Sequence, residues 1–164
     1  FPSAQVREAQ ERVRTAFKNN RLCLPPKKVT VNFAPADMKK EGAGFDLPVA
    51  AAVLAAAGIL EPDLLEGVMI VGEISLNGEI HGVAGVLPRV IRARELGLRF
   101  CVIPEENIRE GNLVKDMPVF GVKSLNDMIR CLRDPNTYTN EYQEKEKTEN
   151  ITRASCIFYE IPIK

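Results

Sequence analysis

The N-terminal part of the chain repeats apolar and polar side chains with the period of a helix. Apolar residues recur at three- and four-residue steps over residues 6–17, and the polar side carries acids and bases together. Glu8 and Arg12 have the i,i+4 spacing that suits an ion pair on a helix. The pattern predicts an amphipathic helix from Ser3, a suitable cap, to about Lys18. Because its charges are mixed, we favour packing on the protein over contact with DNA for this helix.

The next segment predicts a strand, a glycine-bearing loop and a buried helix. Residues 28–34 alternate apolar and polar side chains, which indicates a strand. The polar loop Asp37–Gly44 follows, and the segment Asp46–Ala57 is apolar through its middle. Asp46 fits the helix start, as its cap or as a first-turn acid, and Gly58 fits the helix end. The lack of a polar face predicts that this helix is buried.

A second segment has the same design, with a hairpin inserted. Val68–Leu76 has the pattern of a strand, and Asn77-Gly78 is the strongest hairpin signal in the chain. Glu79–His81 would begin the returning strand. The loop over residues 82–88, with two glycines and a proline, then opens a third helix.

The pattern after the third helix predicts two more strands and one more helix. Arg99–Ile103 is a short buried strand, and Pro104–Glu106 begins a helical turn with acids at its positive end. Val119–Val122 is another strand, and Ser124–Leu132 is a helix with Ser124 as its cap. Strands and helices therefore alternate around an inserted hairpin. This order predicts an α+β fold rather than a simple doubly wound sheet.

The chain of 164 residues is long enough for one domain with a real core. We predict that residues 1–133 form this domain and that residues 134–164 are a linker and tail. Asp134–Asn150 is polar and charged, whereas Ala154–Ile163 is apolar again. An apolar tail and a start that lacks methionine lead us to expect a piece of a larger protein.

Composition narrows the function classes. The 22 basic and 22 acidic side chains cancel, so the chain as a whole has no basic footprint for nucleic acid. The four cysteines are far apart in the sequence, and His81 is the lone histidine, so we expect no metal site. Cys101 lies in an apolar run and is expected in the core. The absence of a signal peptide and of a membrane-length apolar run favours a cytoplasmic protein.

Several dispersed motifs, in order, resemble one family. They are FPSAQVREAQERVR (Phe1–Arg14), VNFAPADMKKEGAGFDL (Val31–Leu47), VGEISLNG (Val71–Gly78), GVAGVLPR (Gly82–Arg89) and VIPEEN (Val102–Asn107). With these motifs the chain resembles the N-terminal domain of the magnesium-chelatase-like AAA+ proteins, a competence-associated family. The resemblance extends from Phe1 to about Leu132 and leaves the tail unmatched.

The resemblance implies a fold, a parent and partners. The fold is the ribosomal protein S5 domain 2-like fold, a mixed sheet with packed helices that is shared with the Lon peptidase domain. In this family other strands precede the first helix and an AAA+ ATPase domain follows the linker, so the sheet is expected to lack its first strands. ATP and Mg²⁺ are expected to bind that missing motor. The implied partners are the domain's own motor and neighbouring subunits of a ring, and the implied process is DNA recombination or competence, or the work of a chelatase-like motor.

Lon-type proteolysis needs a serine nucleophile and a lysine base, and the resemblance gives a position for each. The serine position, before the buried helix, is Gly44, and the lysine position, after the second glycine loop, is Leu87. Neither side chain can do the chemistry, so we predict no catalytic residue. A Ser75–Lys40 pair is the alternative for a degenerate peptidase. The chain also has no GxxxxGK[ST] phosphate loop.

Basic side chains near the two glycine loops form a candidate contact surface. Lys39 and Lys40 lie in the first loop, and Arg89 and Arg92 are three residues apart at the third helix. Together they could bind DNA phosphates, and the alternative is protein contact within a ring. Three hypotheses follow: a non-catalytic accessory domain, a Ser/Lys peptidase and a DNA-binding module.

Overall fold

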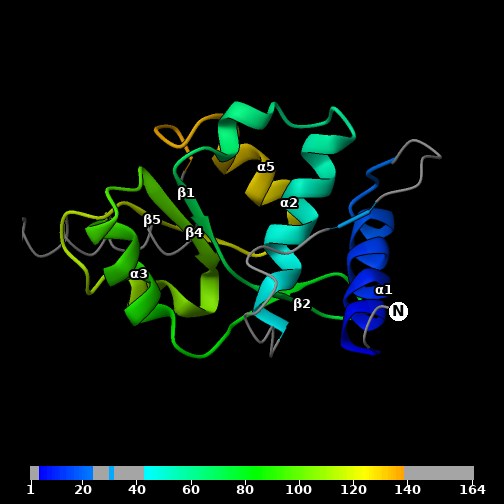
Figure 1. The fold of residues 1–164 in the computed structure, drawn as a ribbon, viewed down its shortest axis with the longest axis horizontal. Coiled ribbons are helices and arrows are strands. Elements are labelled where there is room, and N and C mark those ends of the chain that lie inside the picture. The colour runs from blue at the N-terminus through cyan, green and yellow to red at the C-terminus, as the bar shows by residue number, and fades with distance from the viewer. Residues whose placement is uncertain (1–3, 24–29, 32–42, 139–164) are drawn as a thin grey trace, which may run out of the picture.

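The computed structural model describes residues 4–23, 30–31 and 43–138 of the chain (Figure 1). Its α-helices are α1 (Ala4–Asn19), α2 (Asp46–Ala56), α3 (Val86–Glu95), α4 (Ile108–Gly111) and α5 (Leu125–Arg133). Its strands are β1 (Val68–Ile70), β2 (Glu73–Ile74), β3 (Ile80–His81), β4 (Phe100–Pro104) and β5 (Val119–Val122). Short 3-10 helices are η1 (Ala43–Phe45), η2 (Pro62–Leu65) and η3 (Glu105–Asn107).

β4 is the central strand of a three-stranded parallel sheet. β1 pairs along one side of it and β5 along the other, with Met69 opposite Cys101 and Cys101 opposite Val119. All of β4 is buried. The second sheet is the antiparallel hairpin β2–β3, in which Glu73 lies opposite His81. A parallel sheet, an antiparallel hairpin and packed helices agree with the predicted α+β class.

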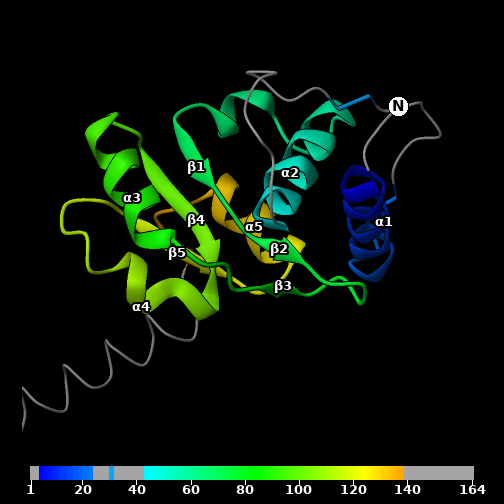
Figure 2. The same cartoon turned by 60° about the horizontal axis from the view of Figure 1, so that its bottom comes forward.

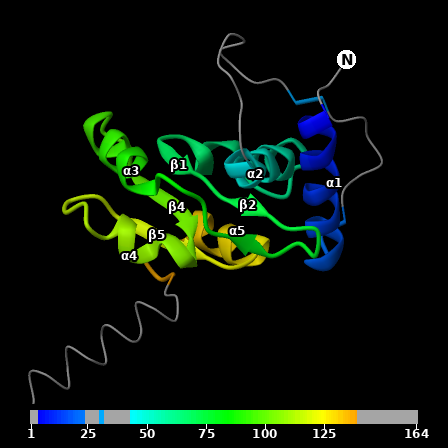
Figure 3. The ribbon, with the colours of Figure 1, turned by 90° about the horizontal axis from the view of Figure 1, so that it is seen from below.

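Helices cover both faces of the parallel sheet, because the side chains of β4 alternate between them. Phe100 and Val102 belong to a core cluster shared with α1, α2 and α5. Cys101 and Ile103 belong to a second cluster, shared with α3 and α4. Figures 2 and 3 show α1 beyond α2, at the opposite end of the molecule from α3. The parallel sheet therefore separates a half that contains α1, α2 and α5 from a half that contains α3 and α4.

Most predicted elements are confirmed. The helices predicted from residues 3, 46 and 124 correspond to α1, α2 and α5, and the loop over residues 82–88 does open α3. Ser124 caps α5, since its hydroxyl accepts the backbone N–H of Asp127 at 3.2 Å. The hairpin turns at Gly78, whose φ of 85° is in the left-handed region that glycine tolerates.

The single strand predicted over Val68–Leu76 is wrong in its middle. Val71 still donates its N–H to the carbonyl of Val102 in β4, but Gly72 donates instead to the carbonyl of Gly44, each at 3.1 Å. The backbone therefore changes partners at Gly72. It leaves the parallel sheet as β1 and begins again as β2 in the hairpin.

Two predicted elements of the N-terminal half differ from the structure or lie partly outside the described residues. Of the strand predicted over residues 28–34, the described residues Thr30 and Val31 are exposed and outside any strand, and the rest lies outside the described part. α2 is not buried all round, because Ala52 and Ala56 are exposed. α2 is an outer layer, and a methyl side chain can face water at little cost, so an apolar sequence does not require burial there.

Packing continues past Arg133 as far as Tyr138. The Tyr138 side chain is only 8% exposed, and its hydroxyl donates to the carbonyl of Gly121 at 2.9 Å. Its ring meets that of Phe120 edge to face. Burial raises the pKa of the phenol above its ordinary value. The core thus includes a residue that the composition assigned to the linker, while residues 139–164 lie outside the described part.

Candidate functional site

The loop that leads into α2 brings Gly44 next to the loop that leads into α3. The carbonyl of Gly44 accepts the N–H of Gly72, and Leu47 donates back to the carbonyl of Gly72, both at 3.1 Å. A Cβ built on Gly44 would lie 3.5 Å from Val71 and 3.8 Å from Val83. Val83 belongs to the second glycine loop, so the two loops do meet. Among the described residues, the neighbours of a Cβ at position 44 are therefore valine side chains.

Leu87 lies in the first turn of α3, at the position where the family resemblance places the lysine of a Lon-type peptidase. Its half-buried side chain packs against the apolar cluster that contains Val71 and Val90. Its backbone N–H donates to the carboxylate of Glu110 at 2.7 Å. An internal anion therefore occupies the positive end of α3. A lysine in place of Leu87 would place its stem against the same apolar cluster.

Three side chains from the segment after β4 hold the second loop in place, and we call them the acidic clasp: Glu106, Asn107 and Glu110. Glu106 accepts the N–H of Gly82 at 2.9 Å. The Asn107 amide both accepts from and donates to the backbone of Val83, each at 2.9 Å. Glu110 completes the clasp at the helix start. Sequence reasoning missed these contacts, because it assigned the acids after Pro104 to the dipole of their own helical turn.

The clasp predicts an acid-dependent stability. The N–H of Gly82, and then the contact with His81, hold the pKa of Glu106 below its ordinary value. A lowered carboxyl pKa contributes stability above the ordinary value near pH 4, and the contribution is lost as pH falls through the folded-state value. We expect Glu106→Gln to lower the free energy of unfolding at pH 7 by up to about 1 kcal/mol, because water screens an exposed charge.

Urea unfolding at several pH values measures this effect, with Glu61→Gln as the control for an exposed glutamate. The deficit of Glu106→Gln relative to the native chain should shrink below about pH 4, where the native carboxylate also becomes protonated. A deficit that stays constant from neutral to acidic pH would contradict the assignment.

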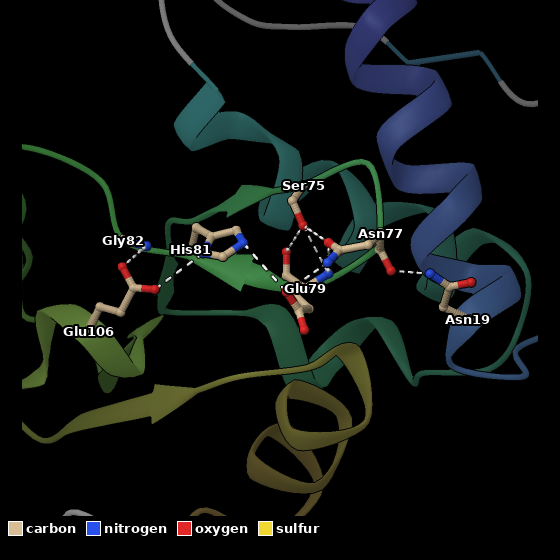
Figure 4. Close-up of polar contacts among 7 residues, drawn as sticks. All are labelled: Asn19, Ser75, Asn77, Glu79, His81, Gly82 and Glu106. Carbon is tan, nitrogen blue, oxygen red and sulfur yellow. Dashed lines mark hydrogen bonds and ion pairs between the residues drawn. The ribbon is translucent and has the colours of Figure 1, made fainter.

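The hairpin β2–β3 is tied to the rest of the protein at both ends (Figure 4). At its tip, the Asn19 side chain of α1 donates to the carbonyl of Asn77. At its base, His81 Nδ1 lies 3.2 Å from Glu106, which also accepts from Gly82. His81 therefore has a structural contact. The hairpin connects the half that contains α1 to the half that contains α3.

Ser75, the alternative nucleophile, belongs to the hairpin turn. Its hydroxyl bonds the Asn77 side chain and lies 3.2 Å from both the N–H and the carbonyl of Glu79 (Figure 4). Lys40, its predicted partner, lies outside the described residues, so the Ser75–Lys40 pair stays a prediction. The contacts that the structure describes give Ser75 a role in turn geometry.

An ion pair joins α1 to the start of α2. Asp46 is 1% exposed, and its carboxylate accepts from Arg12 Nε at 2.7 Å and from Arg12 Nη2 at 3.1 Å. It also accepts the N–H of Ile74 at 3.1 Å. The bonds to Asp46 raise the pKa of Arg12 further, so the guanidinium stays charged. Asp46 is a first-turn acid, as predicted, but its side chain fixes α1, α2 and β2 together rather than capping the helix.

The predicted contact surface is only partly described. Arg89 donates to a backbone carbonyl of its own loop at 2.8 Å, and Arg92 pairs with Glu95 at 3.0 Å. Arg89 and Arg92 are both exposed. Lys39 and Lys40 lie outside the described residues, so a joint surface of these four side chains stays a prediction.

Other candidate chemistry is sparse in the described part. Burial raises the pKa of the Cys101 and Cys131 thiols to about 12, so both remain protonated at neutral pH. Among the described residues, no three His, Cys, Asp or Glu side chains are grouped so that they could hold a metal ion. The described helices include none with both the length and the apolar character needed to cross a membrane.

Comparison with known proteins shows the family of this chain. Residues 1–107 match the family described as subunit ChlI of Mg-chelatase, which is more than half of the chain. The chain belongs to this Mg-chelatase family. The match confirms the resemblance to the magnesium-chelatase-like proteins.

The relatives are much longer proteins. The chain is 40% identical over 132 residues to competence protein ComM of Haemophilus influenzae, covering 80% of this chain and 26% of that protein. It is 42% identical over 114 residues to uncharacterized protein YifB of Salmonella typhimurium, covering 70% and 22%. It is 35% identical over 60 residues to DNA repair protein RadA of Listeria monocytogenes, covering 37% and 13%. The chain thus spans about a quarter of the length of ComM and YifB.

Proposed function

We propose that this chain is a non-catalytic accessory domain of a magnesium-chelatase-like AAA+ ATPase that acts on DNA. In this role it serves assembly or substrate contact. The names of two relatives, a competence protein and a DNA repair protein, support a process that involves DNA. The motor that follows would bind ATP and Mg²⁺, and the domain's partners would be that motor and neighbouring subunits of a cytoplasmic ring.

One observation carries the non-catalytic part of the proposal, namely the surroundings of Gly44 and Leu87. The neighbours of position 44 are valine side chains, and Leu87 packs into an apolar cluster. A serine–lysine dyad needs a nucleophile and a base within hydrogen-bond reach. Apolar packing stabilises the junction of the two loops instead. Two loops that stay joined without a serine–lysine dyad are consistent with a domain that binds a partner rather than one that cleaves a substrate.

The junction of the two loops also supports a proposal about the fold. We infer the ribosomal protein S5 domain 2-like fold, shared with the Lon peptidase domain. The order of strand, glycine loop and helix at α3, and the junction of its loop with Gly44, support it. Because a fold hosts many functions, this inference adds no chemistry to the site.

A casein-cleavage assay tests the proposal against its peptidase alternative. We expect the chain to release no more peptide than buffer, because the junction lacks a nucleophile and a base. Ser75→Ala and Ser124→Ala should behave like the native chain. Cleavage that is lost in Ser75→Ala and kept in Ser124→Ala would overturn the proposal, since Ser124 is only a helix cap.

The second candidate function is direct binding of DNA by this domain. Arg89 and Arg92 are exposed on α3 and support it, together with the relative named for DNA repair. Arg92 already has a carboxylate partner in Glu95, however, which neutralises part of this charge. The basic side chains of α3 are therefore expected to attract DNA phosphates only weakly. Another helix of the molecule presents basic side chains that are less neutralised.

A further inference from the structure

The C-terminal half of α1 carries basic side chains, and only Arg14 has an acid within one helical turn, Glu11, with which it forms no ion pair in the described part of the chain. Arg14 and Lys18 are one turn apart on the same side of the helix, and Arg21 lies in the turn that ends it. All three are exposed. We call these three residues the basic end of α1. The rise of a helix separates Arg14 and Lys18 by about 6 Å along its axis, and Arg21 follows in the turn.

The structure separates the charges that look mixed in the sequence. Glu8 forms an ion pair with Arg12 at 2.8 Å, and Arg12 points on to the buried Asp46. The Arg12–Asp46 pair holds α1 in place, while the exposed Glu8 is paired within the helix. No acidic residue occurs in the sequence between Glu11 and Asp37. The outward side of α1 is therefore acidic only before its basic end.

The basic end also differs from most of the other arginines in the described residues. Arg99 donates to a backbone carbonyl, Arg130 pairs with Asp127, and Arg133 donates to the carbonyl of Ile59. Arg89 and Arg92 are engaged in the same way. By contrast, the side chains of the basic end have no hydrogen-bond or ion-pair partner within the described part of the chain.

Three further described cations, Arg94, Arg109 and Lys115, likewise have no partner there. Each of them is next in sequence to an acid, respectively Glu95, Glu110 and Asp116. Lys18 and Arg21, by contrast, have no acid within three residues in the sequence, and Arg14 has only Glu11, one helical turn before it.

α1 is mounted rigidly enough to present these charges as a fixed surface. Val13, Ala16 and Phe17 are buried against the core, and Arg12 is bonded to Asp46. At the far end, the side chain of Asn19 is bonded to the hairpin turn. Figure 3 shows α1 along the outer side of the molecule, at the end opposite α3.

We propose that the basic end of α1 binds the phosphate backbone of duplex DNA. The proposal deepens the proposed function and rests on it for the class of ligand. A duplex presents about one negative charge per 1.7 Å of its axis, so cations spread along a straight helix can neutralise several phosphates at once. The contact is to phosphates, and it is therefore independent of base sequence. It orients the domain on DNA from the end opposite α3.

Fluorescence anisotropy of a short labelled duplex tests the proposal with the 164-residue chain. The triple variant Arg14→Glu/Lys18→Glu/Arg21→Glu is compared with the matched triple variant Arg89→Glu/Arg92→Glu/Arg94→Glu. At low salt we expect the α1 variant to bind at least about 10-fold more weakly than the native chain, and the α3 variant to stay within about 3-fold. The slope of log K against log salt should be about −2.7 for the native chain, from three contacts of about 0.9 each, and should approach zero in the α1 variant.

Each outcome has a distinct meaning. Native affinity in the α1 variant, or loss in the α3 variant alone, overturns this inference and leaves the proposed function standing. A native chain that does not bind the duplex at low salt overturns both the inference and direct DNA contact by the domain. Circular dichroism checks the fold. If the glutamates unfold α1, the neutral triple variant Arg14→Gln/Lys18→Gln/Arg21→Gln gives the same comparison without reversed charges.

Discussion

Replacing Asp46 by alanine is expected to lower the free energy of unfolding by about 3 kcal/mol, at the lower end of the range for breaking a buried ion pair. The substitution leaves Arg12, 11% exposed, without its buried partner. It also leaves the N–H of Ile74 without its acceptor. The loss should be near the lower end because Arg12 keeps Glu8 as a second partner. Urea unfolding followed by circular dichroism measures it.

Glu8→Ala is the matched control, because it removes the other carboxylate from the same guanidinium. The Glu8 side chain is 67% exposed, so this change should cost less than about 1 kcal/mol. The double variant Arg12→Met/Asp46→Leu should recover part of the loss, since no charge is then left buried. Equal losses in Asp46→Ala and Glu8→Ala would contradict the assignment of Asp46 as the residue that joins α1 to α2.

Gly78→Ala is expected to cost about 2–4 kcal/mol, from a strained backbone and a steric overlap together. Gly78 has a φ of 85°, where an L side chain is unfavourable. A Cβ there would also lie 2.8 Å from the Cα of Ala16 and 3.1 Å from the side-chain nitrogen of Asn19. The hairpin turn must therefore move away from α1, and the turn's bond to Asn19 should weaken with it.

Gly58→Ala separates the two causes. Gly58 also has a positive φ, 75°, but a Cβ there would meet no atom within 4 Å. It should show only the backbone cost, about 1 kcal/mol. Thermal or urea unfolding of both variants gives the difference, and hydrogen exchange at Asn77 and Gly78 locates it. Equal destabilisation would show that the hairpin does not press on α1.

The elements that could be predicted from the sequence are those determined by residues close to one another in the chain. The period of α1, the Asn77-Gly78 turn and the serine cap of α5 all depend on neighbours within a few residues, and all three are confirmed. The break between β1 and β2 could not be predicted in this way. It depends on the bond from Gly72 to Gly44, which comes from a distant part of the chain.

In the candidate site, too, the contacts between distant residues could not be predicted from the sequence. Gly44 and Leu87 were found through the family resemblance, and the structure confirms that the Gly44 loop meets the loop of Val83. The acidic clasp was missed, because Glu106 and Gly82 are 24 residues apart and either residue alone has an ordinary local explanation. Arg12 and Asp46 are 34 residues apart, so their bond was hidden as well.

The charges on α1 show what the sequence pattern leaves out. The sequence has acids and bases interleaved on the polar side of this helix, which favoured packing over DNA contact. Packing is confirmed, since Val13 and Phe17 are buried. The structure adds that Arg12 is directed to the buried Asp46, which leaves the basic end of α1 as a separate surface.

The central claim is that this domain works by contact and not by chemistry, and one sedimentation-velocity experiment tests both halves of it. The 164-residue chain is centrifuged at low salt with a labelled duplex and a quenched fluorescent peptide in the same sample. We predict that the duplex sediments faster with the chain than alone and that the peptide stays intact. A duplex that sediments as free DNA, in a sample whose peptide is cleaved, would contradict the claim.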